Sequence, residues 1–180
     1  PKRCGHLDGK EVVDDATAVK RIRAAVQGRR DPDFLIVART DIRGVGTLEQ
    51  TIERAKRLVD AGADAIFPEA LASLAEFEAV CSALDVPVLA NMTEFGKSEL
   101  FTTRQLADAG VRIVIFPVSL LRLAMGAAER GLDELNQNGT LAGLVPTMQT
   151  RARLYELVDY AGYTAFDKGI YNFDLSSNQG

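Results

Sequence analysis

Three observations on the sequence predict an α/β fold built from the repeating strand–helix units of a (β/α)8 barrel. Four short segments rich in Ile and Val alternate with longer amphipathic segments along most of the chain. Each short segment is nearly all apolar, which is typical of parallel strands that are covered on both faces. A stretch with a helix end, a glycine turn, a strand and a proline also occurs twice. A barrel of alternating strands and helices explains all three.

The elements follow in order along the chain. The predicted strands, each short and rich in branched apolar residues, are residues 34–38, 65–67, 87–90 and 112–116. The predicted helices are 15–26, 48–60, 74–83, 103–109, 120–138, 149–159 and 161–168. Glycine marks two of the helix ends, in Ala61-Gly62 and Ala109-Gly110.

The repeated stretch is Asp-Ala-Gly-Ala-Asp-Ala-Ile-Phe-Pro at 60–68 and Asp-Ala-Gly-Val-Arg-Ile-Val-Ile-Phe-Pro at 108–117. The two copies lie two strand–helix units apart, which is the spacing that a repeating barrel produces. Any parallel α/β fold can reuse such a local pattern, so that alternative stays open. We favour the barrel because no Gly-rich dinucleotide or phosphate-binding motif accompanies the strands.

The length of 180 residues is enough for one domain, and we expect a single domain over residues 1–180. We expect it to begin with a catalytic loop at 1–10, to continue with strand–helix units over 11–140, and to end with helices and a tail over 141–180. Residues 172–180 are small and polar, which is typical of a tail.

Charge and composition exclude several functions. The net charge is −4, which disfavours a nucleic-acid or membrane-surface partner, and no apolar run approaches the ~20 residues of a membrane span. Cys4 and Cys81 show no repeated spacing, which indicates a reducing compartment. We expect a cytoplasmic protein, or one of an organelle matrix such as the mitochondrial matrix if a leader sequence precedes the chain.

The first residues place a cysteine among cations. Cys4 follows Lys2 and Arg3 and stands two residues before His6, the one histidine of the chain. Neighbouring positive charge favours the thiolate, so this segment predicts a loop with an acid–base thiol. One histidine and one nearby cysteine cannot complete a zinc site. Cys81 lies on the apolar side of a predicted helix, and we expect it in the core.

Polar residues follow each predicted strand. They are Arg39, Thr40 and Asp41 after the first, Glu69 after the second, Asn91 and Thr93 after the third, and Ser119 and Arg122 after the fourth. Barrel enzymes gather their catalytic groups at these strand ends. Arginines bind carboxylates through two parallel hydrogen bonds, and carboxylates such as Asp41 and Glu69 suit Mg²⁺. This mixture predicts a polycarboxylate substrate bound with Mg²⁺.

Each of these residues also has a structural interpretation. Arg39 and Asp41 could form an ion pair with each other, and Glu69 could be a favourable charge at a helix N-terminus. Asn91 and Thr93 could be helix caps, and Arg151 could be a surface residue of a helix.

Five motifs together resemble the isocitrate lyase/phosphoenolpyruvate mutase superfamily in its methylisocitrate lyase branch. They are Lys-Arg-Cys-Gly-His at 2–6, Ala-Arg-Thr-Asp at 38–41, Phe-Pro-Glu-Ala at 67–70, Leu-Ala-Asn-Met-Thr-Glu-Phe-Gly at 89–96 and Met-Gln-Thr-Arg at 148–151. The resemblance covers about residues 1–160. It implies the C-terminal half of a (β/α)8 TIM-type barrel with extra C-terminal helices, assembled as a dimer of dimers that exchanges a helix between neighbours.

The resemblance also implies roles for individual residues. Cys4 is the catalytic thiol, with Lys2, Arg3 and His6 in the same catalytic motif, and Gly5 supplies a backbone contact to the substrate. The substrate-binding positions are Cys4, Gly5, Arg39, Glu69, Asn91, Thr93, Arg122 and Arg151. The implied reaction is a carbon–carbon cleavage of 2-methylisocitrate to pyruvate and succinate, in which Cys4 acts as general acid or base.

The resemblance implies Mg²⁺ as the cofactor. The direct magnesium ligands of the superfamily are aspartates on earlier strands that have no counterpart in this sequence, so we expect no direct metal ligand here and a need for the N-terminal half of the barrel. A dimethylmalate or oxaloacetate carbon–carbon lyase of the same superfamily is the nearest alternative. A non-catalytic barrel fragment that acts as an assembly subunit is another.

Overall fold

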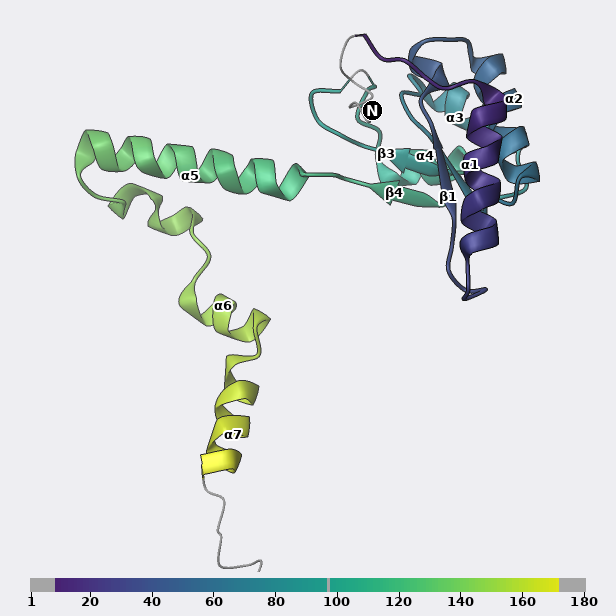
Figure 1. Ribbon diagram of the computed structural model, residues 1–180. Coiled ribbons are helices and arrows are strands. Elements are labelled where there is room, and N and C mark those ends of the chain that lie inside the picture. The colour runs from purple at the N-terminus through teal and green to yellow at the C-terminus, as the bar shows by residue number, and fades with distance from the viewer. Residues whose placement is uncertain (1–8, 97, 172–180) are drawn as a thin grey trace, which may run out of the picture. The chain divides into compact units, whose positions relative to one another are not determined.

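The computed structural model describes residues 9–96 and 98–171, which form two compact units (Figure 1). The first unit extends to Leu123 and the second begins at Ala124. The catalytic motif predicted at 2–6 and the tail at 172–180 lie outside the described residues. The single domain expected over the whole chain stays a prediction.

Four parallel strands form the centre of the first unit. They are β1 (Val37–Thr40), β2 (Ala65–Pro68), β3 (Leu89–Asn91) and β4 (Ile113–Ile115). β1 pairs with β2 and β3 pairs with β4, both parallel, and a single parallel bridge between Ile66 and Val88 joins the two pairs. The spatial order therefore follows the sequence without a reversal, as in a barrel and unlike a doubly wound sheet.

The helices of this unit begin where a side chain can satisfy the first free backbone N–H groups. They are α1 (Asp15–Gly28), α2 (Leu48–Asp60), α3 (Leu74–Ser82) and α4 (Thr103–Asp108), with a short 3-10 helix, η1 (Ile42–Gly44), after β1. Thr47 and Thr102 each form a complete capping box with the glutamine three residues later. Asp14 and Ser73 cap the other two helices.

One face of the sheet carries the core. Side chains alternate between faces along a strand, and the face of Ala38, Ile66, Val88, Ala90 and Met92 is buried. These residues form two apolar clusters with side chains of the helices. The two clusters are the packing that holds the strands to the helices.

The opposite face is less covered at β1, so the expectation that every strand is buried on both faces is wrong for β1. Val37 and Arg39 are exposed, and Phe67 and Asn91 are only partly buried. The physical reason is that the helices pack on the other face; on this face Ala65 and Leu89 are still buried, whereas β1 exposes Val37 and Arg39.

The first strand begins later than predicted. Phe34 and Leu35 are about two-thirds exposed, and pairing starts at Val37 opposite Ala65. The Asp64 carboxylate accepts the N–H of Ile36, the residue before the strand, at 2.8 Å. Arg39 and Thr40 therefore belong to the strand, and Asp41 is the first residue after it. The other strands lie within one or two residues of their predicted ends.

The two copies of the repeated stretch occupy equivalent places. Gly62 and Gly110 both adopt positive φ, 102° and 95°. A Cβ added to Gly62 would lie 2.9 Å from Val26 at the end of α1, and one added to Gly110 would lie 2.8 Å from Cys81 at the end of α3. Each glycine thus lets a helix–strand turn approach the preceding helix closely. Cys81 is half-buried against this core, and burial raises the pKa of its thiol.

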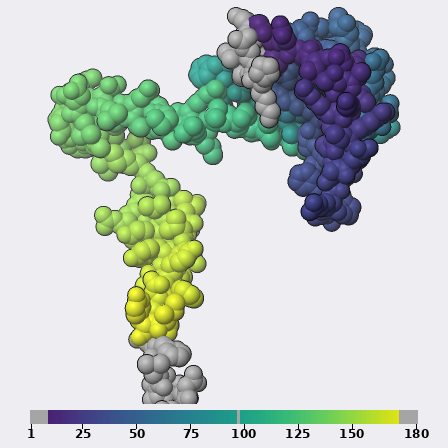
Figure 2. Space-filling model, viewed as in Figure 1, coloured from purple at the N-terminus to yellow at the C-terminus, as the bar shows by residue number. Residues whose placement is uncertain are grey.

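The second unit is helical. The long helix α5 (Ser119–Asn138) begins in the first unit and continues in the second, followed by η2 (Ala142–Thr147), α6 (Arg151–Leu157) and α7 (Tyr160–Tyr171). None of its described residues is buried, and much of its helix surface is uncovered in Figure 2 (green to yellow). The rings of Tyr155 and Tyr160 stack, with 4.6 Å between their centres. No helix in the described part of the chain has the length and apolar character of a membrane span.

Candidate functional site

Five polar residues gather at the carboxyl ends of β1, β2 and β3, and we call them the strand-end cluster: Lys10, Arg39, Asp41, Glu69 and Asn91. The parallel register explains why they meet. It sets Arg39 opposite Phe67, and the N–H of Glu69 bonds to the carbonyl of Thr40 at 2.9 Å. Side chains up to 81 positions apart in sequence thus lie at one edge of the sheet.

Arg39 is the centre of the cluster. Its Nε lies 2.8 Å from Asp41 Oδ1, and its Nη2 lies 3.1 Å from both Asp41 Oδ2 and Glu69 Oε2. The guanidinium also lies over the Phe67 ring, 4.9 Å from its centre. The structural interpretation of Arg39 and Asp41 as an ion pair is therefore correct, but the pair extends to Glu69 as well.

Asp41 joins the cluster to the segment before α1. Lys10 Nζ lies 2.5 Å from Asp41 Oδ2, and both side chains are largely buried. Burial raises the pKa of Asp41, but hydrogen bonds from Arg39 and Lys10 and their charges outweigh burial and hold the pKa below its usual range. Lys10 was not predicted from the sequence, because nothing in its spacing pairs it with a residue 31 positions later.

Glu69 is almost completely buried, with 2% of its surface exposed. The Nδ2 of Asn91 lies 3.4 Å from each of its carboxylate oxygens. The helix α3 begins only at Leu74, so Glu69 is not a charge at a helix N-terminus. Nor does Asn91 cap a helix, since Thr102 caps the next one. Within the described residues, Asn91 Oδ1 is buried without a hydrogen-bond partner.

A second polar group forms around Arg122. Its Nη1 donates to the Glu94 carbonyl at 2.8 Å, to Glu94 Oε2 at 3.0 Å and to Thr93 Oγ1 at 3.4 Å. The guanidinium lies 5.4 Å from the centre of the Phe95 ring. The structure thus brings together Thr93 and Arg122, two predicted substrate-binding residues, and adds Glu94 and Phe95 as their neighbours.

The predicted residues outside these two groups are Cys4, Gly5 and Arg151, together with Lys2, Arg3 and His6. Residues 2–6 lie outside the described part of the chain. Arg151 is exposed at the first position of α6, in the second unit. Its substrate-binding role, like that of the residues at 2–6, stays a prediction.

The backbone after three strands is strained. Ala70 after β2, Phe95 after β3 and Val118 after β4 all have positive φ, between 58° and 67°. A residue with a Cβ adopts this conformation at a cost of about 1–2 kcal/mol, so the surrounding contacts must hold it. Such strain is commonest at binding and catalytic sites, and here it adjoins Glu69, Glu94 and Ser119.

The described residues hold no group of three or more His, Cys, Asp or Glu side chains placed to bind a metal. Asp41 and Glu69 are the two carboxylates of the strand-end cluster, and Arg39 contacts both. This donor set does not fit a direct Mg²⁺ site by itself.

Comparison with known proteins gives consistent matches. The family model described as phosphoenolpyruvate phosphomutase matches residues 3–136. The probable 2-methylisocitrate lyase 2 of Corynebacterium glutamicum is 53% identical over 177 residues, which are 98% of this chain and 58% of that protein. The 2-methylisocitrate lyase of Escherichia coli is 47% identical over 162 residues, 90% of this chain and 55% of that protein.

A solved structure supports the fold. Oxaloacetate acetylhydrolase, in complex with the inhibitor 3,3-difluorooxalacetate, matches with a TM-score of 0.84 at 35% identity. The match covers 97% of this chain and 59% of that one. It confirms the predicted α/β fold. The chain spans less than three-fifths of the length of each of these three proteins.

Proposed function

Because the chain belongs to the phosphoenolpyruvate mutase/isocitrate lyase superfamily, we propose that the protein containing it is a carbon–carbon lyase that cleaves 2-methylisocitrate to pyruvate and succinate. The observation that carries the proposal is the strand-end cluster. Arg39 lies between two carboxylates, and Asn91 has a buried oxygen without a partner within the described residues. Relatives with the name 2-methylisocitrate lyase support this substrate.

The proposed binding follows from the donors at the site. Arg39, Arg122 and Arg151 bind substrate carboxylates, since a guanidinium has five N–H donors and can contact a protein carboxylate and a substrate together. All three hydrogen bonds of Arg122 use Nη1. Asn91 Oδ1 accepts a substrate hydroxyl, and Thr93 and the Gly5 backbone contact further oxygens. Glu69 fixes the position of Arg39 and Asn91 around the substrate.

The proposed reaction breaks the bond between the hydroxyl-bearing carbon and its neighbour. A base that we assign to the rest of the protein takes the hydroxyl proton. The hydroxyl-bearing carbon then becomes the keto carbon of pyruvate, and the electron pair of the broken bond moves to the other fragment. That fragment becomes succinate when the Cys4 thiol gives it a proton. Lys2, Arg3 and His6 surround Cys4 in sequence, and their charge would stabilise the resulting thiolate.

The proposed cofactor is Mg²⁺, which would polarise the hydroxy-acid end of the substrate when bound. Since the donor set of the described residues does not fit a direct site, we assign the direct ligands to the rest of the protein. No step above depends on a metal ligand from this chain.

The proposed assembly is a dimer of dimers that also contains the N-terminal half of the barrel. Its support is the amount of uncovered apolar surface. Leu154, Tyr163, Phe166 and Ile170 of α6 and α7 are each about half or more exposed, and such surfaces mark interfaces. In the first unit, β1 pairs with β2 alone among the described strands, so its other edge offers the place for a further strand.

The function is tested on the complete protein that contains this chain. We expect pyruvate release from 2-methylisocitrate with a kcat/KM well above that for isocitrate, 2,3-dimethylmalate and oxaloacetate. The substitution Cys4→Ser should keep substrate binding, measured by calorimetry, and lose turnover by at least ~100-fold. Cys81→Ser is the matched control and should keep full turnover. A preference for dimethylmalate or oxaloacetate would favour the alternative lyases, and no turnover of any substrate would favour the non-catalytic assembly subunit.

A further inference from the structure

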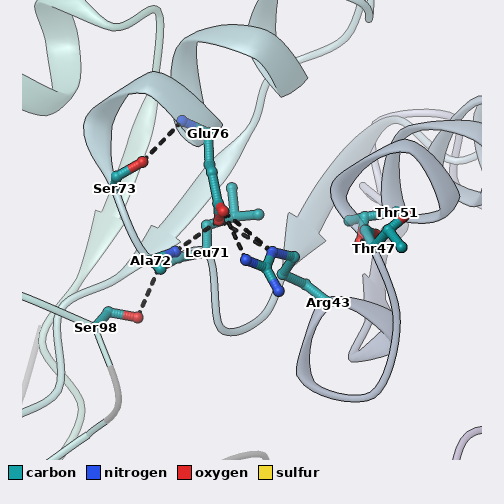
Figure 3. Close-up of polar contacts among 8 residues, drawn as sticks. All are labelled: Arg43, Thr47, Thr51, Leu71, Ala72, Ser73, Glu76 and Ser98. Atoms are coloured by element: carbon teal, nitrogen blue, oxygen red, sulfur yellow. Dashed lines mark hydrogen bonds and ion pairs between the residues drawn. The ribbon is translucent and has the colours of Figure 1, made fainter.

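An ion pair between Arg43 and Glu76 joins the segments that follow β1 and β2 (Figure 3). Arg43 lies in η1 and Glu76 in the first turn of α3. Arg43 Nη2 lies 2.7 Å from Glu76 Oε1, and its Nε lies 3.2 Å from each carboxylate oxygen. The two side chains are 29% and 16% exposed, so solvent screens this pair less than a surface pair.

The Glu76 carboxylate also holds the segment between β2 and α3. It accepts the N–H of Ala72 at 2.8 Å, while Ser73 accepts the N–H of Glu76 at 3.3 Å (Figure 3). Ser98, from the segment after β3, donates to the Leu71 carbonyl at 2.7 Å. Three successive strand-end segments are therefore connected through residues 71–76.

This segment begins with the strained residue next to Glu69. Ala70 has a φ of 67° and separates the buried Glu69 from the buried Leu71. A strained residue keeps its conformation only where contacts on both sides hold it. On one side Glu69 bonds through its backbone to Thr40, and on the other Ala72 bonds to Glu76.

We propose that Arg43 and Glu76 are positioning residues, which set the segment after β2 against the segment after β1 and thereby fix Glu69 relative to Arg39. Arg43 follows Asp41 by two residues, so the ion pair connects both sides of the Arg39–Glu69 contact. Neither residue is assigned a contact with substrate. The effect of this ion pair on turnover rests on the proposed function, whereas its effect on the conformation of residues 69–73 does not.

The chain contains a matched control at the opposite ends of the same strands. Asp64 lies just before β2 and accepts Arg29 Nη1 at 2.8 Å and the N–H of Ile36 at 2.8 Å. This carboxylate also joins an arginine to a backbone N–H near a strand, with side chains 22% and 30% exposed. We therefore expect Asp64→Asn to lower stability about as much as Glu76→Gln, but to leave the conformation of the strand-end cluster unchanged.

The experiment compares Glu76→Gln and Asp64→Asn in the complete protein. We expect kcat/KM to fall about tenfold or more in Glu76→Gln and to stay within about twofold in Asp64→Asn, with similar losses of Tm. Arg43→Met should reproduce the effect of Glu76→Gln, and the double variant should be no worse than either single variant. Equal effects of Glu76→Gln and Asp64→Asn on kcat/KM would overturn the proposal.

Hydrogen–deuterium exchange separates this proposal from the proposed function, because it needs no turnover. Amides at residues 69–73 should exchange at least several-fold faster in Glu76→Gln than in Asp64→Asn or the parent. Unchanged exchange there would overturn the positioning role even in an active lyase. Faster exchange in a protein that lacks lyase activity would support the positioning role and refute the proposed function.

Discussion

At the scale of single residues, the chemistry of the first unit depends on how one arginine is held. Arg39 contacts Asp41 and Glu69 with a planar guanidinium that also lies over Phe67. A lysine at this position would keep the charge but could not keep two parallel hydrogen bonds and the contact over the ring. The planar geometry of the guanidinium, in addition to its charge, holds Arg39 between Asp41 and Glu69.

Arg39→Lys should therefore lower kcat/KM of the complete protein by about 10–100-fold, since a group displaced by an ångström can cost that much. Steady-state kinetics with 2-methylisocitrate measures the effect. Arg29→Lys, at the other end of β1, is the control and should stay within about twofold. A fully active Arg39→Lys variant would show that substrate turnover does not depend on the guanidinium.

At the scale of elements, the helix–strand turns at Gly62 and Gly110 should be the least tolerant of a side chain. Gly62→Ala and Gly110→Ala combine positive φ with a Cβ placed under 3.0 Å from Val26 or Cys81. Each should lower the free energy of unfolding by about 1–3 kcal/mol. Gly28→Ala meets open space and should be neutral or slightly stabilising, so urea unfolding of all three checks the argument. Equal stabilities would contradict it.

The ion pairs at the strand ends predict the response of stability to acid. Burial raises the pKa of Glu76, but hydrogen bonds from Arg43 and Ala72 outweigh it and lower the pKa below its ordinary value of 4.5. As the pH falls, Glu76 therefore binds a proton in the unfolded chain before it does so in the folded protein. Its contribution to the free energy of unfolding is complete above about pH 5 and is lost as the pH falls through the pKa of Glu76 in the folded protein.

The free energy of unfolding should accordingly fall less steeply below pH 4.5 in Glu76→Gln than in the parent, as measured by urea midpoints between pH 7 and pH 3.5. Glu156→Gln removes an exposed pair with Arg153 and should follow the parent curve, because exposed pairs contribute little. A Glu76→Gln curve parallel to that of the parent would rule out the linkage.

At the scale of the whole molecule, the described residues cover one face of the four consecutive parallel strands only in part, and Val37 and Arg39 of β1 are exposed on it. The relatives are longer, and this chain spans 58% of the protein from Corynebacterium glutamicum. A barrel covers this face with its remaining strands, which also supply the other groups of the active site.

The isolated 180-residue polypeptide should therefore show no lyase turnover. Addition of a polypeptide that carries the N-terminal half of the barrel should restore pyruvate release and lower the binding of a dye for apolar surfaces. Turnover by the isolated polypeptide would contradict the need for the other half.

Most of the fold was predictable because it depends on local patterns. The strands, the helices and the two glycine turns follow from apolar periodicity, caps and the repeat at 60–68 and 108–117. The start of β1 was not predictable, because Phe34 and Leu35 look like strand residues, and only the tertiary structure shows that pairing starts at Val37 opposite Ala65. The exposure of Val37 was also not predictable from the sequence, since burial depends on which residues pack on each face of the strand.

The sequence by itself determined the superfamily, the order of the elements and the residue types at the strand ends, because motifs and periodicity are properties of neighbouring residues. Only the tertiary structure decided the partners. Lys10 with Asp41, Arg39 with Glu69, and Arg43 with Glu76 are up to 33 positions apart, and nothing in their spacing pairs them. Their meeting depends on the parallel register, which brings the carboxyl ends of successive strands to one edge of the sheet.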